Sequence, residues 1–146
     1  MTNESKNYKL LLDTEPLIKL FAKENGWEVV QKILLRIESG EVEAAISIIT
    51  LTEIYYKYIH EKKADLAKAR VENLKYATYL KKLGVDEKIA IKAGEFKGKY
   101  SIPIADSLIS ATAYYNDSIV ISDDLDFKKI TEIKVQSEQE YLSSIK

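Results

Sequence analysis

The segment Leu10-Leu11-Leu12-Asp13-Thr14-Glu15-Pro16 decides the fold of this chain. Its apolar run predicts a short buried strand over residues 8–12. The hydroxyl, acid and proline that follow are typical of the first turn of a helix. Leu17, Ile18 and Phe21 then continue at helical spacing. The chain therefore begins with a strand–helix unit, and Asp13 falls at the carboxyl end of the strand.

The same alternation continues along the rest of the sequence. Apolar segments predict further strands over residues 43–49, 117–122 and 132–135. Helical patterns follow the first strand and recur over residues 27–38, 51–61, 64–83, 86–100 and 105–115. The segment 136–146 reads as a polar tail with one helical turn through Tyr141, Leu142 and Ile145.

Strands that alternate with helices predict an α/β fold. We expect a single domain over residues 1–146, with its core at about 8–135. Its architecture should be an α/β/α sandwich around a mainly parallel sheet of four or five strands. A chain of 146 residues is long enough for one such domain to bury its own core.

Composition excludes several kinds of chemistry. The chain has no cysteine, which rules out disulfides, thiol catalysis and cysteine-bound zinc. A single histidine, His60, disfavours a histidine-rich metal site and a Ser-His-Asp triad, and we expect it at the surface of a helix end. The start, Met1–Lys6, lacks the apolar core of a signal peptide, and no apolar run approaches the roughly 20 residues that span a bilayer. We expect a cytoplasmic protein with no membrane association.

Four carboxylates at the edges of apolar segments are the strongest functional signal: Asp13, Glu53, Asp106 and Asp124. Three of them follow predicted strands, and sites in parallel sheets form outside the carboxyl ends of strands. Asp106 opens a predicted helix and joins the others only if the start of that helix points to the same edge. Gathering ionised carboxylates near a core is costly unless a cation neutralises them. If the four converge, a divalent metal site is the economical explanation.

Each acid also has a simpler structural interpretation. Asp13 or Thr14 would serve as a helix cap. Thr50 and Glu53 match the spacing of a capping box. Asp106 would interact favourably with the helix dipole. Asp124 would belong to a polar turn. A carboxylate at a helix start serves both roles, so these interpretations stay open for each acid.

The acids lie in four stretches whose order is more distinctive than any one of them: residues 11–14, 47–54, 104–113 and 119–127. The ordered set resembles the PIN-domain nucleases, and especially the compact VapC-type toxins of bacterial and archaeal toxin–antitoxin pairs. The resemblance covers residues 8 to about 135.

The resemblance implies that Asp13, Glu53, Asp106 and Asp124 bind Mg²⁺ or Mn²⁺. Asp126 is an auxiliary acid that competes with Asp124 for the fourth place. Hydroxyls are expected from Thr14 and from Ser122, where the family more usually has threonine. The implied activity is metal-dependent endoribonuclease cleavage of RNA by a toxin. The implied partners are an antitoxin whose tail blocks the site and a second copy of the chain in a homodimer.

Two surface features accompany the acids. Residues 57–99 contain twice as many basic as acidic side chains, interleaved with tyrosines. This composition indicates either an RNA path or a solvated helical face. The apolar positions Ile54, Tyr55, Tyr58 and Ile59 would form a groove for a partner helix.

Two other functions remain open. One is a catalytically silent PIN module that binds RNA or serves in assembly. The other is a phosphohydrolase with Asp13 as an aspartyl nucleophile, although Glu15 stands where such enzymes place a second aspartate.

Overall fold

The computed structural model describes residues 8–145, and the polar start Met1–Lys6 lies outside them. Within this part of the chain, five parallel strands form one sheet in the order β3-β2-β1-β4-β5. Their bounds are β1 Leu10–Leu12, β2 Ala44–Ser47, β3 Leu80–Leu83, β4 Ile119–Ile121 and β5 Lys134–Gln136. The predicted α/β sandwich with a parallel sheet is confirmed.

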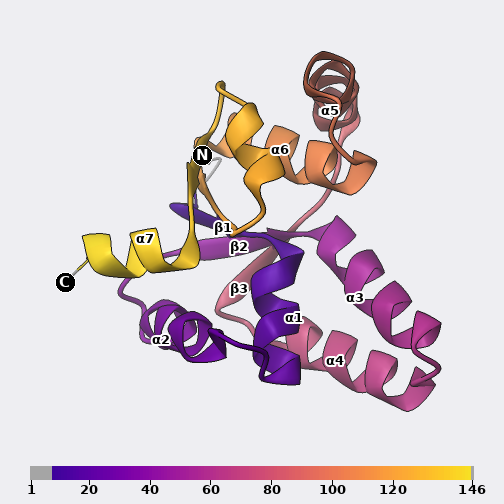
Figure 1. Cartoon of the computed structure of the whole chain (residues 1–146), viewed down its shortest axis with the longest axis vertical. Helices are drawn as coiled ribbons and strands as arrows, with labels where there is room; N and C mark the ends of the chain where they lie inside the picture. The colour runs from indigo at the N-terminus through magenta and orange to yellow at the C-terminus, as the bar shows by residue number, and fades with distance from the viewer. Residues whose placement is uncertain (1–7, 146) are drawn as a thin grey trace, which may run out of the picture.

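Helices cover both faces of this sheet (Figure 1). One face packs against α1 (Thr14–Ala22), α2 (Trp27–Glu38), α3 (Ile48–His60), α4 (Ala64–Tyr76) and α7 (Glu138–Ser144). The opposite face packs against α6 (Ile104–Asn116), the 3₁₀ helix η1 (Leu125–Lys129) and, behind α6, α5 (Glu87–Tyr100). Among residues 8–145, no helix is both long and apolar enough to cross a bilayer.

The pleat of β1 explains why its three leucines are all buried. Leu10 and Leu12 belong to the core beneath α1–α4, whereas Leu11 packs with Ile109 and Phe127 on the other face. Successive side chains of a strand point to opposite faces, so a central strand with both faces covered is continuously apolar. The run 10–12 is thus the sequence signature of the central strand.

One predicted helix, over residues 64–83, is confirmed to residue 76 and wrong beyond it. The helix α4 ends at Tyr76, and Leu80–Leu83 form the edge strand β3, paired with β2. Leu80 is buried in the core while Lys81 is exposed. Leucine and lysine favour helices intrinsically, but pairing with β2 outweighs that preference, and lysine is common on exposed sheet edges.

The junction between the second strand and the helix that follows it also differs from the prediction. The second strand ends at Ser47, whose hydroxyl accepts a hydrogen bond from the Ile49 amide and starts α3 at Ile48. The predicted capping box of Thr50 and Glu53 is therefore wrong, because both residues lie inside α3.

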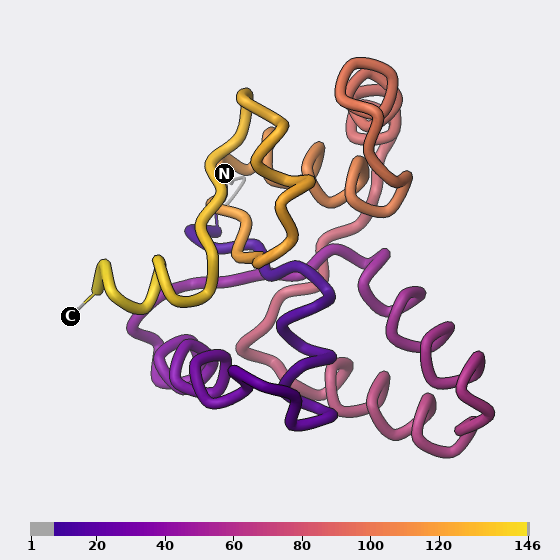
Figure 2. Tube along the Cα trace, viewed as in Figure 1, coloured from indigo at the N-terminus to yellow at the C-terminus, as the bar shows by residue number. Residues whose placement is uncertain are grey.

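The C-terminal segment is more than a polar tail. A capping box of Ser137 and Glu140 starts α7, which has about two turns. Tyr141 and Leu142 are buried in the main core. In Figure 2 this yellow segment runs back from β5 to lie beside α2.

Candidate metal centre

The predicted acids meet at the carboxyl edge of the sheet, where the strand order reverses around β1. Asp13 directly follows β1, which lies between β2 and β4. Glu53 lies in the second turn of α3, after β2, and Asp124 follows β4 and caps η1. Such a reversal is the usual position of a binding site in open α/β sheets.

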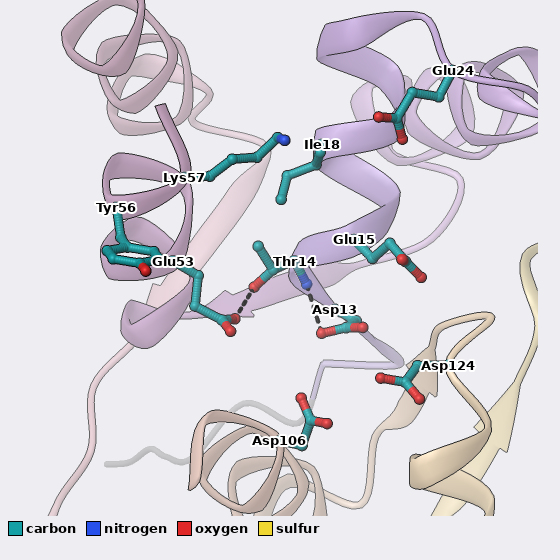
Figure 3. A pocket seen from close by; sticks show the side chains of 10 residues that line it. All are labelled: Asp13, Thr14, Glu15, Ile18, Glu24, Glu53, Tyr56, Lys57, Asp106 and Asp124. Carbon is teal, nitrogen blue, oxygen red and sulfur yellow. Dashed lines mark hydrogen bonds between the residues drawn. The ribbon is translucent and has the colours of Figure 1, made fainter. Parts of the chain in front are cut away.

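Asp106 reaches the same edge from the first turn of α6. A helix that leads into a parallel strand runs antiparallel to it, so its N-terminus lies at the carboxyl edge. Figure 3 shows the Asp106 carboxylate facing those of Asp13, Glu53 and Asp124. All four line a pocket of about 400 Å³. The structure therefore brings the four predicted acids together.

Asp13 is held firmly by the surrounding fold. Its side chain is only 5% exposed. One carboxylate oxygen accepts a hydrogen bond from the Thr14 amide at 2.7 Å, and the other accepts one from the Ser122 hydroxyl at 2.8 Å. Burial raises the pKa of Asp13 to about 7, although these two hydrogen bonds act in the opposite direction. The capping role and a site role coexist in this residue.

The Thr14 hydroxyl connects α1 to α3. It donates a hydrogen bond to the Glu53 carboxylate (Figure 3). It also lies 3.0 Å from the Thr50 hydroxyl. Thr14 and Thr50 are buried, so this contact is shielded from water. The predicted auxiliary hydroxyls, Thr14 and Ser122, thus each orient one acid. Thr50 joins them, which the sequence did not indicate.

The remaining acids form the tightest group. One carboxylate oxygen each from Asp106, Asp124 and Asp126 lie within 4.8 Å of one another. Asp124 accepts a hydrogen bond from the Asp126 amide at 2.9 Å, and its own amide donates to Ser122 at 3.0 Å. The Asp126 carboxylate also lies 2.9 Å from the Lys129 ammonium, and this acid is not part of the pocket lining.

Asp106 has no comparable support. Among residues 8–145, no group donates a hydrogen bond to its carboxylate. Burial, followed by repulsion from Asp124, Glu53 and Asp126, raises the pKa of Asp106 to about 7. A partly buried carboxylate surrounded by acids is stabilised by a proton or by a cation. The donor set consists of carboxylate oxygens, which suits hard ions such as Mg²⁺ and Mn²⁺.

The pocket also contains side chains that the prediction missed. Glu15, Ile18 and Glu24 line it from the α1 side, and Tyr56 and Lys57 line it from α3. Tyr56 and Lys57 follow Glu53 by three and four residues, which places all three on one helical face. That spacing was available in the sequence. Lys57 is the cationic side chain of the lining, and it pairs with Glu61.

The predicted surface features are rearranged. The basic stretch 57–99 is divided among α3, α4, β3 and α5. Ile54 and Tyr58 are core residues, so their predicted place in a groove is wrong. A shallow apolar groove instead involves Leu51, Tyr55, Tyr56, Ile59 and Val71. His60 is exposed at the end of α3, as predicted, and stacks on Tyr56.

An α/β protein with a pocket of carboxylates at the carboxyl edge of its parallel sheet has the type of site that suits a divalent metal ion. The chain belongs to the PIN domain family, whose sequence model matches residues 10–133. No curated protein sequence matches it significantly.

Solved structures share this fold. VapBC2 from Rickettsia felis, bound to a DNA fragment from its promoter, has 19% identity and a TM-score of 0.72, covering 88% of this chain and 97% of that one. VapBC from Salmonella typhimurium, bound to DNA, has 22% identity and a TM-score of 0.71, covering 90% and 98%. A toxin–antitoxin complex from Klebsiella pneumoniae has 22% identity and a TM-score of 0.65, covering 89% and 98%.

Proposed function

We propose that this PIN domain is a Mg²⁺- or Mn²⁺-dependent endoribonuclease that hydrolyses RNA phosphodiester bonds. The observation that carries the proposal is the convergence of Asp13, Glu53, Asp106 and Asp124 in one pocket. Asp106 in particular has acidic neighbours and no hydrogen-bond donor among residues 8–145, so a cation would stabilise it.

The acids of the pocket have different roles in the proposed reaction. Asp106 and Asp124 would hold the ion, and Asp126 is close enough to replace one of them. Asp13, oriented by Ser122, would contribute a further oxygen from the β1 side. Glu53, aligned by Thr14, accepts a proton from the attacking water. When bound, Mg²⁺ or Mn²⁺ supplies a Lewis acid that activates water and offsets charge on the phosphate.

Lys57 gives the acidic pocket a complementary contact for the substrate. Its ammonium lies at a pocket otherwise dominated by carboxylates, and it is suited to a phosphate oxygen of the RNA. Tyr56 beside it is 65% exposed and offers a face for base stacking.

We further propose that the protein is the toxin of a toxin–antitoxin pair, that it works in the cytoplasm and that it forms a homodimer. Structures with the same fold come from VapBC complexes and from a toxin–antitoxin complex. The apolar groove on α3 and α4 reaches the acidic pocket at Tyr56, so a protein segment lying in it would lie beside the acids. Co-expression with an adjacent small reading frame, followed by co-purification, tests this pairing.

The two alternative functions are less well supported. Both oxygens of Asp13 accept hydrogen bonds and the side chain is buried, which favours a fixed ligand over a nucleophile that attacks phosphorus. An aspartyl-phosphate trapped at Asp13 would support the phosphohydrolase. The silent module lacks support because all four acids are present and converge.

The deciding experiment compares Asp13→Asn and Asp106→Asn with the parent chain. Both variants should lose Mn²⁺-dependent cleavage of single-stranded RNA while circular dichroism shows an intact fold. Glu28→Gln, an exposed change on α2, is the matched control and should cleave normally. Undiminished cleavage by both aspartate variants would refute the assignment. Absence of both Mn²⁺ binding and cleavage in the parent chain would favour the silent module.

A further inference from the structure

The C-terminal helix α7 carries a buried acid that the proposed reaction does not use. Glu138, its first residue, is only 2% exposed and follows the matched PIN region 10–133. Both of its carboxylate oxygens accept hydrogen bonds from the Lys19 ammonium, at 2.8 and 3.0 Å. The Lys19 side chain, from α1, is itself 13% exposed. The pair is thus largely removed from water.

Asp123 completes this group and connects it to the candidate metal centre. One of its carboxylate oxygens accepts a hydrogen bond from Lys19 at 3.0 Å, and the other accepts one from the Glu138 amide at 3.0 Å. Asp123 therefore has one bond from α1 and one from α7. It is the chain neighbour of Ser122, which orients Asp13, and of Asp124.

A second contact joins α7 to the same loop. Lys128 of η1 lies 3.2 Å from the Glu140 carboxylate. The segment between these two contacts contains Asp124 and Asp126, the acids that approach Asp106. Both ends of the acidic segment are therefore tied to α7.

A buried ion pair is an expensive way to attach a helix. Removing two charges from water costs free energy that their attraction does not always restore, and apolar residues of the same size often give equal or higher stability. Such a pair is better explained when it holds a segment of the chain in one conformation. Here that segment is the loop that contains Asp124 and Asp126, whose carboxylates repel Asp106.

We propose that Lys19, Asp123 and Glu138 form a positioning cluster that holds Asp124 in place against this repulsion. This inference rests on the proposed metal-dependent nuclease. None of the three residues lines the acidic pocket, so they act through the loop and not on the substrate. Under this proposal the C-terminal helix α7 is needed to position an acid of the candidate metal centre.

The double variant Lys19→Met/Glu138→Gln tests the cluster without changing the net charge near the site. It also leaves no unpaired buried charge, so it should fold. We expect its Mn²⁺ affinity, measured by calorimetry, to fall about tenfold, the lower range seen when a residue that orients a ligand is lost. The turnover number should fall at limiting Mn²⁺ and recover at high Mn²⁺, while the KM for RNA stays unchanged.

The single variant Lys19→Met distinguishes positioning from simple electrostatics, because the two predict opposite changes in Mn²⁺ affinity. Removing a positive charge would strengthen cation binding through space. Loss of positioning would weaken it, and weakening is the expected result. Lys19→Arg retains donors for both carboxylates and should restore most of the affinity.

Ile33→Val, on the buried face of α2, is the control for lowered stability. It should reduce the melting temperature without changing Mn²⁺ affinity. Parent-like Mn²⁺ affinity and turnover in the double variant would overturn the positioning inference alone. A parent chain that neither binds Mn²⁺ nor cleaves RNA would overturn both this inference and the proposed function.

Discussion

The two halves of the acidic pocket are stabilised in different ways. On the β1 side, Asp13 and Glu53 accept hydrogen bonds from Ser122, Thr14 and the backbone. On the α6 side, Asp106 faces Asp124 and Asp126 without a donor of its own among residues 8–145. The acids of the first half are satisfied by hydrogen bonds from the protein. In the second half Lys129 pairs with Asp126, whereas Asp106 has acidic neighbours and no donor in the part of the chain that the structure describes.

This difference indicates how such a site is built. A hydrogen-bonded carboxylate is fixed in orientation before any ligand arrives, and this lowers the cost of binding. A carboxylate that only faces other acids gains most from a cation. We therefore expect the β1 side to set the geometry and the α6 side to supply most of the affinity.

The largest expected effect separates the two halves directly. Asp106→Asn should abolish detectable Mn²⁺ binding and reduce cleavage by more than about 100-fold, beyond the loss usual for a residue that only orients a ligand. Glu53→Gln should lose cleavage but retain measurable Mn²⁺ binding, because its amide oxygen still accepts the hydrogen bond from Thr14. Calorimetry with Mn²⁺ distinguishes them. Equal loss of binding in both variants would contradict the division into halves.

The next comparison lies within the α6 side. Asp124 lines the pocket, whereas Asp126 is paired with Lys129. Asp124→Asn should reduce cleavage by roughly 100-fold and Asp126→Asn by roughly tenfold or less, the two ends of the range for ligands and their supports. Steady-state cleavage of one RNA at saturating Mn²⁺ gives both values. A larger loss in Asp126→Asn than in Asp124→Asn would make Asp126 the fourth metal-binding acid.

A smaller effect is expected from the hydroxyls of the β1 side. Thr14→Val keeps the shape of the buried side chain but removes the bond to Glu53, and we expect about a tenfold loss in turnover. Thr14→Ser retains the hydroxyl and is the matched control. A normal rate for Thr14→Val would show that Glu53 needs no orientation by α1.

Much of this arrangement could be predicted from the sequence. The run Leu10–Leu12 predicted a buried strand, because a strand covered on both faces has no polar side. The position of the acids after strands then placed them at one edge. Asp106, which precedes its strand, was predicted to join them only if the start of its helix points to that edge, and the structure has α6 in this direction.

Other features depend on contacts between distant segments. The strand Leu80–Leu83 exists because β2 offers a partner for its backbone, and its leucines and lysines alone resemble a helix. The burial of Glu138 depends on Lys19, more than a hundred residues earlier. Neither contact has a local pattern, so the prediction gave a longer helix and a polar tail in their place.

The smallest effect concerns the stability of the metal-free protein. The folded state raises the carboxyl pKa of Asp13 and Asp106 from 3.8 to about 7. The folded chain therefore keeps protons that the unfolded chain releases at about pH 4. The stabilising contribution is full below that pH and is lost as the pH rises to about 7. Solvent screens the partly exposed Asp106, so we expect the contribution of this residue to lower the free energy of unfolding by only about 1 kcal/mol.

Thermal melts between about pH 4 and pH 7 test this effect, with Asp106→Asn as the comparison. The variant cannot ionise at this position, so its stability should fall less over the same interval than that of the parent. Mn²⁺ should restore stability to the parent at pH 7, because an ion that binds only the folded state replaces the lost protons. It should do little for the variant. If stability falls equally with pH in the two proteins, the pKa of Asp106 is not raised in the folded state. The contrast between the two halves of the pocket would then be wrong.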